Sequence, residues 1–120
     1  MQDIDEYQKR ALTTNLGETP DYPFELLSEE VGEVSGKLAK YMRTHKVTKA
    51  EAIQHAKEGL TAEAANLHSH LIKELGDVGW AWVVACSELG LFPSSVLREN
   101  LEKLKDRQLR GVIDGQGDLR

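Results

Sequence analysis

Apolar residues recur every three or four positions through most of this chain, and this spacing most constrains its fold. The period places the apolar side chains of a segment along one side of an α-helix. A half-buried strand would show strict alternation instead, which no segment of this sequence does. Three prolines and ten glycines fall mostly between the periodic stretches, where such residues end helices and form turns. The sequence therefore predicts an all-α fold.

We expect four main helices and one short inserted helix in a single domain over residues 1–120. The short helix is predicted over Thr48 to Gly59, because Thr48 and Glu51 have the spacing of a capping box. Residues 110–120 are rich in glycine and aspartate and are expected to form a turn-rich tail. The main helices are predicted from about Asp3 to Asn15, from Pro23 to about Thr44, from Thr61 or Ala62 to Leu89, and from Pro93 to near Gly111.

Twenty acidic and fifteen basic side chains give the chain a formal charge of −5. This charge disfavours non-specific binding to a nucleic-acid polymer or to an anionic membrane. The most apolar window, Val78 to Cys86, is far shorter than the roughly 20 residues that cross a bilayer. The single cysteine, Cys86, cannot form an internal disulfide and is expected to be a small buried hydrophobe. We therefore expect a cytoplasmic protein without a membrane span.

Carboxylates gather at two places along the predicted helices. Glu29, Glu30 and Glu33 lie within little more than one turn of the second main helix, and Glu74 and Asp77 lie three residues apart on the third. The helical wheel places Glu74 inside the apolar stripe of its helix. Burying a carboxylate in a helix interface lowers the stability of the fold by several kcal/mol unless a partner compensates its charge. Glu74 is therefore the residue that most needs an explanation.

Two kinds of compensation for these charges are open. If the second and third main helices pack side by side, four carboxylates form an all-oxygen cage of the kind that magnesium or manganese prefers: Glu30, Glu33, Glu74 and Asp77. A lysine or arginine would instead neutralise part of the charge. The first cluster alone would also be explained by a solvated helix face.

Polar side chains on the last predicted helix form a row of hydrogen-bond donors. Asn100, Lys103 and Arg107 fall within about 60° of one another on the helical wheel. An ordinary amphipathic helix needs no function for such a row, but beside a metal site it suits phosphate oxygens. Trp80 projects close to the direction of Asp77.

The four histidines give a weaker signal. His68 and His70 point in nearly opposite directions on a helix and cannot form a local zinc pair, so both are expected at the surface or at an interface. His70 lies one turn before Glu74 and could contact the acidic site. No role is predicted for His45 or His55.

The string Glu29-Glu30-x-x-Glu33, followed by Glu74-Leu75-Gly76-Asp77, resembles the signature of MazG-like all-α nucleoside triphosphate pyrophosphohydrolases. The resemblance extends over most of the chain through further segments: Tyr7-Gln8, Asn100, Lys103, Arg107 and the ending Gly115-Gln116-Gly117-Asp118-Leu119-Arg120. Forty residues separate the two acidic strings, more than is usual in the family, because the short predicted helix lies between them.

The resemblance implies a four-helix-type bundle that forms a homodimer or homotetramer. It also implies magnesium, with manganese possible, bound by Glu30, Glu33, Glu74 and Asp77. The implied reaction cleaves a nucleoside triphosphate between its α- and β-phosphates, releasing a nucleoside monophosphate and pyrophosphate. Glu29 would orient or deprotonate the attacking water, and the basic row would hold phosphates. Trp80 would stack a nucleotide base or contact another subunit. The alternatives are an enzyme similar to phosphoribosyl-ATP pyrophosphohydrolase and a non-catalytic helical module that binds a basic protein.

Overall fold

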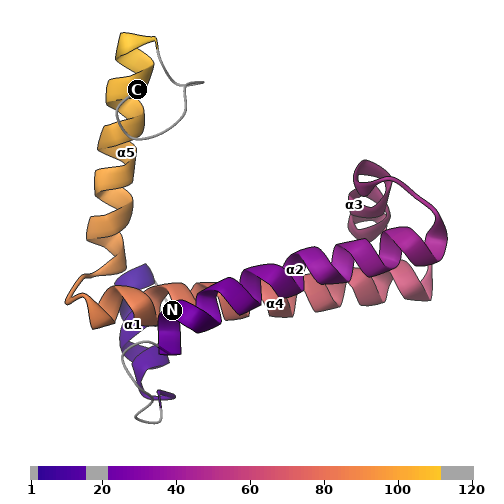
Figure 1. The fold of residues 1–120 in the computed structure, drawn as a ribbon, viewed down its shortest axis with the longest axis horizontal. Coiled ribbons are helices and arrows are strands. Elements are labelled where there is room, and N and C mark those ends of the chain that lie inside the picture. The colour runs from indigo at the N-terminus through magenta and orange to yellow at the C-terminus, as the bar shows by residue number, and fades with distance from the viewer. Residues whose placement is uncertain (1–2, 16–21, 112–120) are drawn as a thin grey trace.

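A computed structural model describes residues 3–15 and 22–111, and these residues form five helices and no strand. The all-α prediction is thus confirmed, and the inserted short helix is present as α3. Of the tail predicted over residues 110–120, Arg110 belongs to α5 and Gly111 caps that helix, and residues 112–120 lie outside the described residues. In chain order the helices are α1 (Ile4–Leu12), α2 (Tyr22–His45), α3 (Lys49–Glu58), α4 (Ala62–Glu88) and α5 (Pro93–Arg110) (Figure 1).

Local sequence signals fix the ends of α3 and the start of α4. The Thr48 hydroxyl accepts from the Glu51 amide at 3.1 Å, and the Glu51 carboxylate accepts from the Thr48 amide at 3.0 Å, which completes the predicted capping box. Gly59 ends α3 with φ of 62°, a left-handed conformation that favours glycine. Thr61 then caps α4 by accepting from the Ala64 amide. These signals make α3 a distinct helix rather than a loop.

The two longest helices, α2 and α4, lie side by side and antiparallel along most of their length (Figure 1). One row of buried and half-buried positions on α4 recurs in alternating steps of three and four, the spacing of an interhelical seam. The row consists of Ala64, Leu67, Leu71, Glu74, Val78, Ala81 and Ala85. A row of partly or fully buried positions on α2 follows the same steps through Leu27, Glu30, Val34, Lys37 and Tyr41. Charged residues therefore occupy the middle of this seam.

Two apolar residues that follow the helical period on α2 and α4 are exposed rather than buried in the seam. Val31 is 50% exposed and Leu75 is 57% exposed, whereas their chain neighbours Glu30 and Glu74 are half-buried. One residue along a helix is a rotation of about 100°, so the seam cannot bury both neighbours of a pair. The apolar stripe read from the sequence was therefore wider than the buried face, and the inward place of Glu74 is confirmed.

Two small apolar clusters hold the shorter helices to the ends of the α2/α4 pair. At one end, Tyr41 of α2, Ala52 and Ala56 of α3, and Leu67 of α4 pack together. At the other end, α1 packs Ala11 against two fully buried valines of α4, Val83 and Val84. The buried Gln8 side chain of α1 also donates hydrogen bonds to the carbonyls of Val83, at 2.9 Å, and Leu91, at 3.0 Å.

Helix α5 leaves the rest of the chain at a bend of 96° from α4 and extends away from the α2/α4 pair (Figure 1). It is held to α1 by Asp5, whose carboxylate accepts hydrogen bonds from the amide and the hydroxyl of Ser94. The radius of gyration is 17.5 Å, whereas a compact chain of this length has about 14 Å. The predicted four-helix bundle is therefore not confirmed within one chain.

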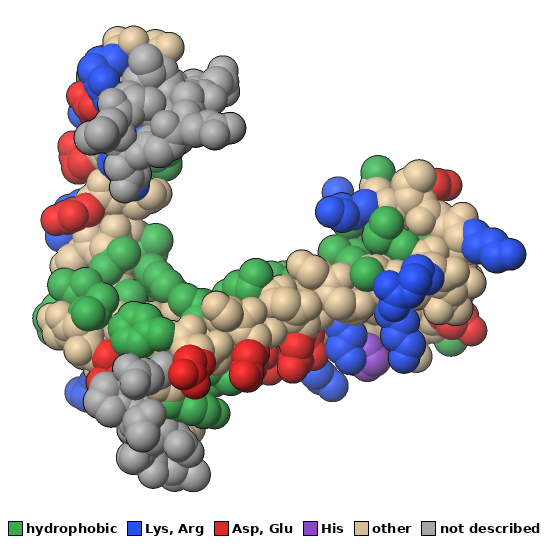
Figure 2. All heavy atoms as spheres, in the orientation of Figure 1, with side chains coloured by type: hydrophobic (Ala, Val, Ile, Leu, Met, Phe, Trp, Pro, Cys, Tyr) green, Lys and Arg blue, Asp and Glu red, His purple; other side chains and the backbone are tan. Residues whose placement is uncertain are grey.

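Apolar side chains remain exposed on this open shape. Figure 2 shows them gathered around the corner between α4 and α5. The most exposed large ones along these two helices and the turn between them are Ile72, Leu75, Leu89, Phe92, Leu101 and Leu109.

The most apolar window of the sequence lies within α4, where Cys86 is buried. Burial raises the pKa of the Cys86 thiol, which agrees with its predicted role as a small hydrophobe. Among the described residues no single helix is long and apolar enough to cross a membrane. Only α4 and α5 taken together, across their 96° bend, satisfy that test by length and composition.

Candidate metal centre

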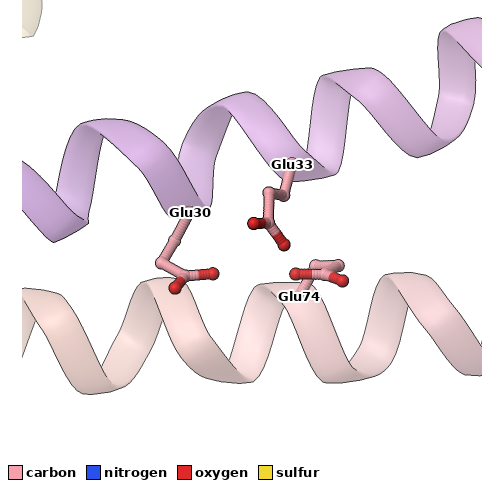
Figure 3. A group of neighbouring side chains, drawn as sticks. All are labelled: Glu30, Glu33 and Glu74. Atoms are coloured by element: carbon pink, nitrogen blue, oxygen red, sulfur yellow. The ribbon is translucent and has the colours of Figure 1, made fainter.

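Three carboxylates converge in the middle of the α2/α4 seam. Glu30 and Glu33 extend from α2 toward Glu74 of α4 (Figure 3). One carboxylate oxygen from each residue lies within 4.8 Å of the other two. Glu30 and Glu74 are half-buried because they occupy seam positions, and Glu33 is exposed at the edge of the seam. The structure therefore brings together three of the four predicted metal ligands.

The crowding of these groups changes how Glu74 ionises. A hydrogen bond with Glu33 raises the pKa of Glu74, and burial and the negative charges of Glu33 and Asp77 add to the effect. The positive charge of Lys37 acts in the opposite direction, but the net shift remains upward. Without a bound cation, this crowding favours a proton on Glu74. A metal ion would displace that proton, because carboxylate ligands bind metals in their ionised form.

The remaining predicted acids border the same group. Burial raises the pKa of Glu30 first, and then the charges of Glu33, Asp77 and Glu29 raise it further. Asp77 also adds to the raised pKa of Tyr7, which is caused mainly by burial of the phenol of this α1 residue. Asp77 and Glu29 are exposed and lie outside the close group of three. Both are near enough to act on it electrostatically.

One atom of the group has no hydrogen-bond partner. The Oε2 atom of Glu74 is buried, and nothing in the described part of the chain bonds to it. A buried carboxylate oxygen without a partner is costly, and a cation is the partner that its charge favours. Magnesium binds oxygen ligands at about 2.0–2.1 Å, so opposite ligands are about 4 Å apart, and small side-chain rotations would bring these oxygens to that spacing. The three residues therefore fit a hard divalent cation.

The family of the chain follows from its sequence match over these same helices. The model of the MazG nucleotide pyrophosphohydrolase domain matches residues 18–111, which include both acidic strings and all of α5. The chain belongs to this MazG family. A curated relative, the Gene 37 protein of Mycobacterium phage L5, is 34% identical to this chain over 91 residues. The aligned region covers 76% of this chain and 68% of the phage protein. No solved structure matches the chain.

The structure does not bring the predicted substrate-binding residues of this MazG protein to the acidic group of the same chain. Asn100 and Lys103 are exposed on α5, and Arg107 is buried near the far end of that helix (Figure 1). Trp80 is half-buried against the cluster that joins α1 to α4, and its indole N–H donates to the Thr14 hydroxyl at 2.8 Å. Trp80 therefore has a packing partner in α1.

Sequence reasoning indicated His70 beside the acidic group but missed the lysines that lie near it toward α3. Lys37 and Lys40 of α2 lie with His70 of α4 along a pocket between the two helices. Beyond them, His45 stacks on the Tyr41 ring with centroids 4.0 Å apart, and the Tyr41 hydroxyl is 2.9 Å from Nδ1 of His55. The spacing Glu30-Val34-Lys37-Tyr41 already followed the seam and could have indicated the position of Lys37.

Proposed function

We propose that this MazG protein is a magnesium-dependent hydrolase that cleaves a nucleoside triphosphate into a nucleoside monophosphate and pyrophosphate. The observation that carries the proposal is the convergence of Glu30, Glu33 and Glu74 in the α2/α4 seam, with a buried oxygen of Glu74 that lacks a partner. Family membership supports nucleotide pyrophosphohydrolase activity of this general type. The particular nucleotide and the metal belong to the proposal.

The proposed reaction uses the carboxylates in two roles. Glu30, Glu33 and Glu74 would hold magnesium, and Asp77, which acts electrostatically on the same group, would complete the set. When bound, magnesium neutralises charge on the phosphate oxygens and makes phosphorus easier to attack. The oxygen of a water forms a bond to the α-phosphorus while the bond from that phosphorus to the α–β bridging oxygen breaks. The electron pair leaves with pyrophosphate, and Glu29 takes the proton of the water.

The basic row would act on the site of a second copy of the chain. Helix α5 extends away from the acidic group of its own chain, so Asn100, Lys103 and Arg107 would meet phosphates only across an interface. The exposed apolar side chains of α4 and α5 would be buried in such an interface. We accordingly propose a homodimer or homotetramer, in which Trp80 would lie near a base or a neighbouring subunit.

The direct test is to incubate the purified full chain with magnesium and a panel of nucleoside triphosphates that also includes phosphoribosyl-ATP. We expect release of pyrophosphate rather than orthophosphate, and its loss when EDTA removes the metal. Glu33→Gln and Glu74→Gln are expected to lower the rate at least about 100-fold, because each removes a charged ligand. Glu88→Gln is the matched control, since Glu88 is an exposed residue at the other end of α4.

Other outcomes of this assay would contradict the proposal. Orthophosphate release would reject the α–β bond as the cleaved bond. Activity on phosphoribosyl-ATP alone would replace the proposed substrate class. A protein that neither hydrolyses any nucleotide nor gains thermal stability from magnesium with nucleotide would be a binding module, because ligands that bind the folded state raise its melting temperature.

A further inference from the structure

A cleft of about 350 Å³ lies directly beside the acidic group, between α2 and α4. Its α2 wall begins at Lys37, one turn after Glu33, and its α4 wall ends at His70, one turn before Glu74. Because the two helices are antiparallel, these two boundaries fall at the same level of the seam (Figure 1). The cleft and the acidic group are therefore consecutive sections of the α2/α4 seam.

The charge changes sign from one section to the next. Lys37 and Lys40 of α2 and His70 of α4 line the cleft, and Glu63 is the carboxylate among its lining residues. In Figure 2 the acidic side chains at the middle of the α2/α4 pair are followed, toward α3, by Lys or Arg side chains with a histidine among them. The Asn66 amide adds a neutral donor to the lining. This lining suits an anion with several oxygens.

The length of the two sections matches an extended polyphosphate. Lys40 follows Glu33 by seven positions, and a rise of 1.5 Å per residue places them about 10 Å apart along the helix. Tyr41 at the cleft is only 8% exposed and stacks on His45, so its ring is not offered to a nucleotide base.

The two sections meet at Lys37. This residue lines the cleft and lies one turn along α2 from Glu33 of the acidic group. An anion bridging both sections would meet cations at each end, a metal at one and lysines at the other.

We propose that the cleft holds the distal phosphates of the nucleoside triphosphate, and afterwards the leaving pyrophosphate, through Lys37 and Lys40. The substrate then lies along the α2/α4 seam with its α-phosphate at Glu30, Glu33 and Glu74. This assignment rests on the proposed hydrolysis, and it gives each chain a phosphate-binding pair of its own besides the row on α5.

The test measures binding of inorganic pyrophosphate and of AMP to the full chain by calorimetry in excess magnesium. A Lys37→Gln/Lys40→Gln double variant is expected to bind pyrophosphate at least about tenfold more weakly, because two charge-assisted contacts are lost. AMP has no distal phosphates, so its affinity should change less than about twofold. Lys37→Arg/Lys40→Arg keeps the charges and should restore most of the pyrophosphate affinity. Lys57→Gln on α3, outside the cleft, is the matched control and should match the wild type.

The outcomes separate this assignment from the proposed function. Undiminished pyrophosphate binding in the double variant, or loss of AMP binding instead, would overturn the cleft as the distal-phosphate site while hydrolysis still occurred. Absence of pyrophosphate binding by the wild type would also overturn it. A wild type that binds pyrophosphate through the two lysines but hydrolyses no nucleotide would retain the anion site and reject the enzyme.

Discussion

At the scale of single residues, Glu74 decides what the seam between α2 and α4 can do. Its position follows the buried heptad of α4, where every other member is apolar. The carboxylate therefore faces Glu33 and Glu30 rather than solvent. An apolar residue here would pack the two helices more tightly and remove the possibility of a metal site. Glu74 is thus a charged residue at a seam position where packing alone would favour leucine.

The ionisation of Glu74 predicts how stability depends on pH. Its folded-state pKa lies above the usual glutamate value of 4.5, so the folded chain holds that proton more tightly than the unfolded chain. The resulting stabilisation is complete below 4.5 and is lost as the pH rises through the raised pKa. In EDTA, the free energy of unfolding of the wild type should thus fall, relative to Glu74→Gln, between mildly acidic and neutral pH.

Urea unfolding at a series of pH values measures this difference. Glu88→Gln should keep the wild-type slope, since Glu88 lies outside the acidic group. Magnesium should reduce the loss at neutral pH, because the ion replaces the proton as the partner of the carboxylates. Parallel curves for the wild type and Glu74→Gln would contradict the raised pKa of Glu74.

At the scale of helices, the order and ends of the elements could be predicted because their causes are local. The capping box at Thr48, the glycine stop at Gly59 and Pro93 at the start of α5 each act within a few residues. The spacing also placed Glu74 on the buried side, and its meeting with Glu30 and Glu33 was expected on the condition that the two helices pack side by side. The cleft at Lys37 and the direction of α5 could not be predicted, because they depend on how whole helices pack.

The capping box gives α3 a measurable share of its stability. Thr48→Ala removes the hydroxyl that accepts from the Glu51 amide, and we expect a loss of about 1 kcal/mol in the free energy of unfolding. Thr48→Ser keeps the acceptor and should lose only a small fraction of that amount. Chemical denaturation of the three proteins measures the effect. An equal loss for serine and alanine would mean that the cap contributes nothing.

Helix α1 is attached to α4 through Gln8. Gln8→Ala would remove a hydrogen-bond donor from the buried Val83 carbonyl and from the Leu91 carbonyl, at a cost of about 2 kcal/mol in the free energy of unfolding. Lys9→Ala, at the adjacent exposed position, should change it by less than about 0.5 kcal/mol. Thermal and urea unfolding compare the two variants, and equal effects would contradict a bridging role for the amide.

At the scale of the whole molecule, the open shape separates the acidic group from the basic row. The α2/α4 pair carries the carboxylates, while α5 extends away at a bend of 96° with exposed leucines such as Leu97 and Leu101. A chain with extents of 44 × 43 × 28 Å and so much exposed apolar surface is expected to associate. The sequence predicted association through family resemblance, and the arrangement of α5 supplies a physical reason for it.

Analytical ultracentrifugation tests this expectation. The wild type should sediment as a dimer or a tetramer, and Leu101→Glu should shift it toward a smaller species, because a charge would be buried in the interface. Lys105→Glu, an exposed position one turn further along α5, is the comparison for charge alone. A wild type that sediments as a monomer would contradict the proposed assembly.

The separation of α5 from its own carboxylates also affects how the enzyme should be assayed. If a neighbouring chain contributes the phosphate-binding side chains of each catalytic centre, the turnover rate per chain depends on the fraction of chains that are associated. Specific activity would then decline on dilution and recover on concentration. Mixing two inactive variants, one altered on α2 and the other on α5, would regenerate hybrid centres with every group intact.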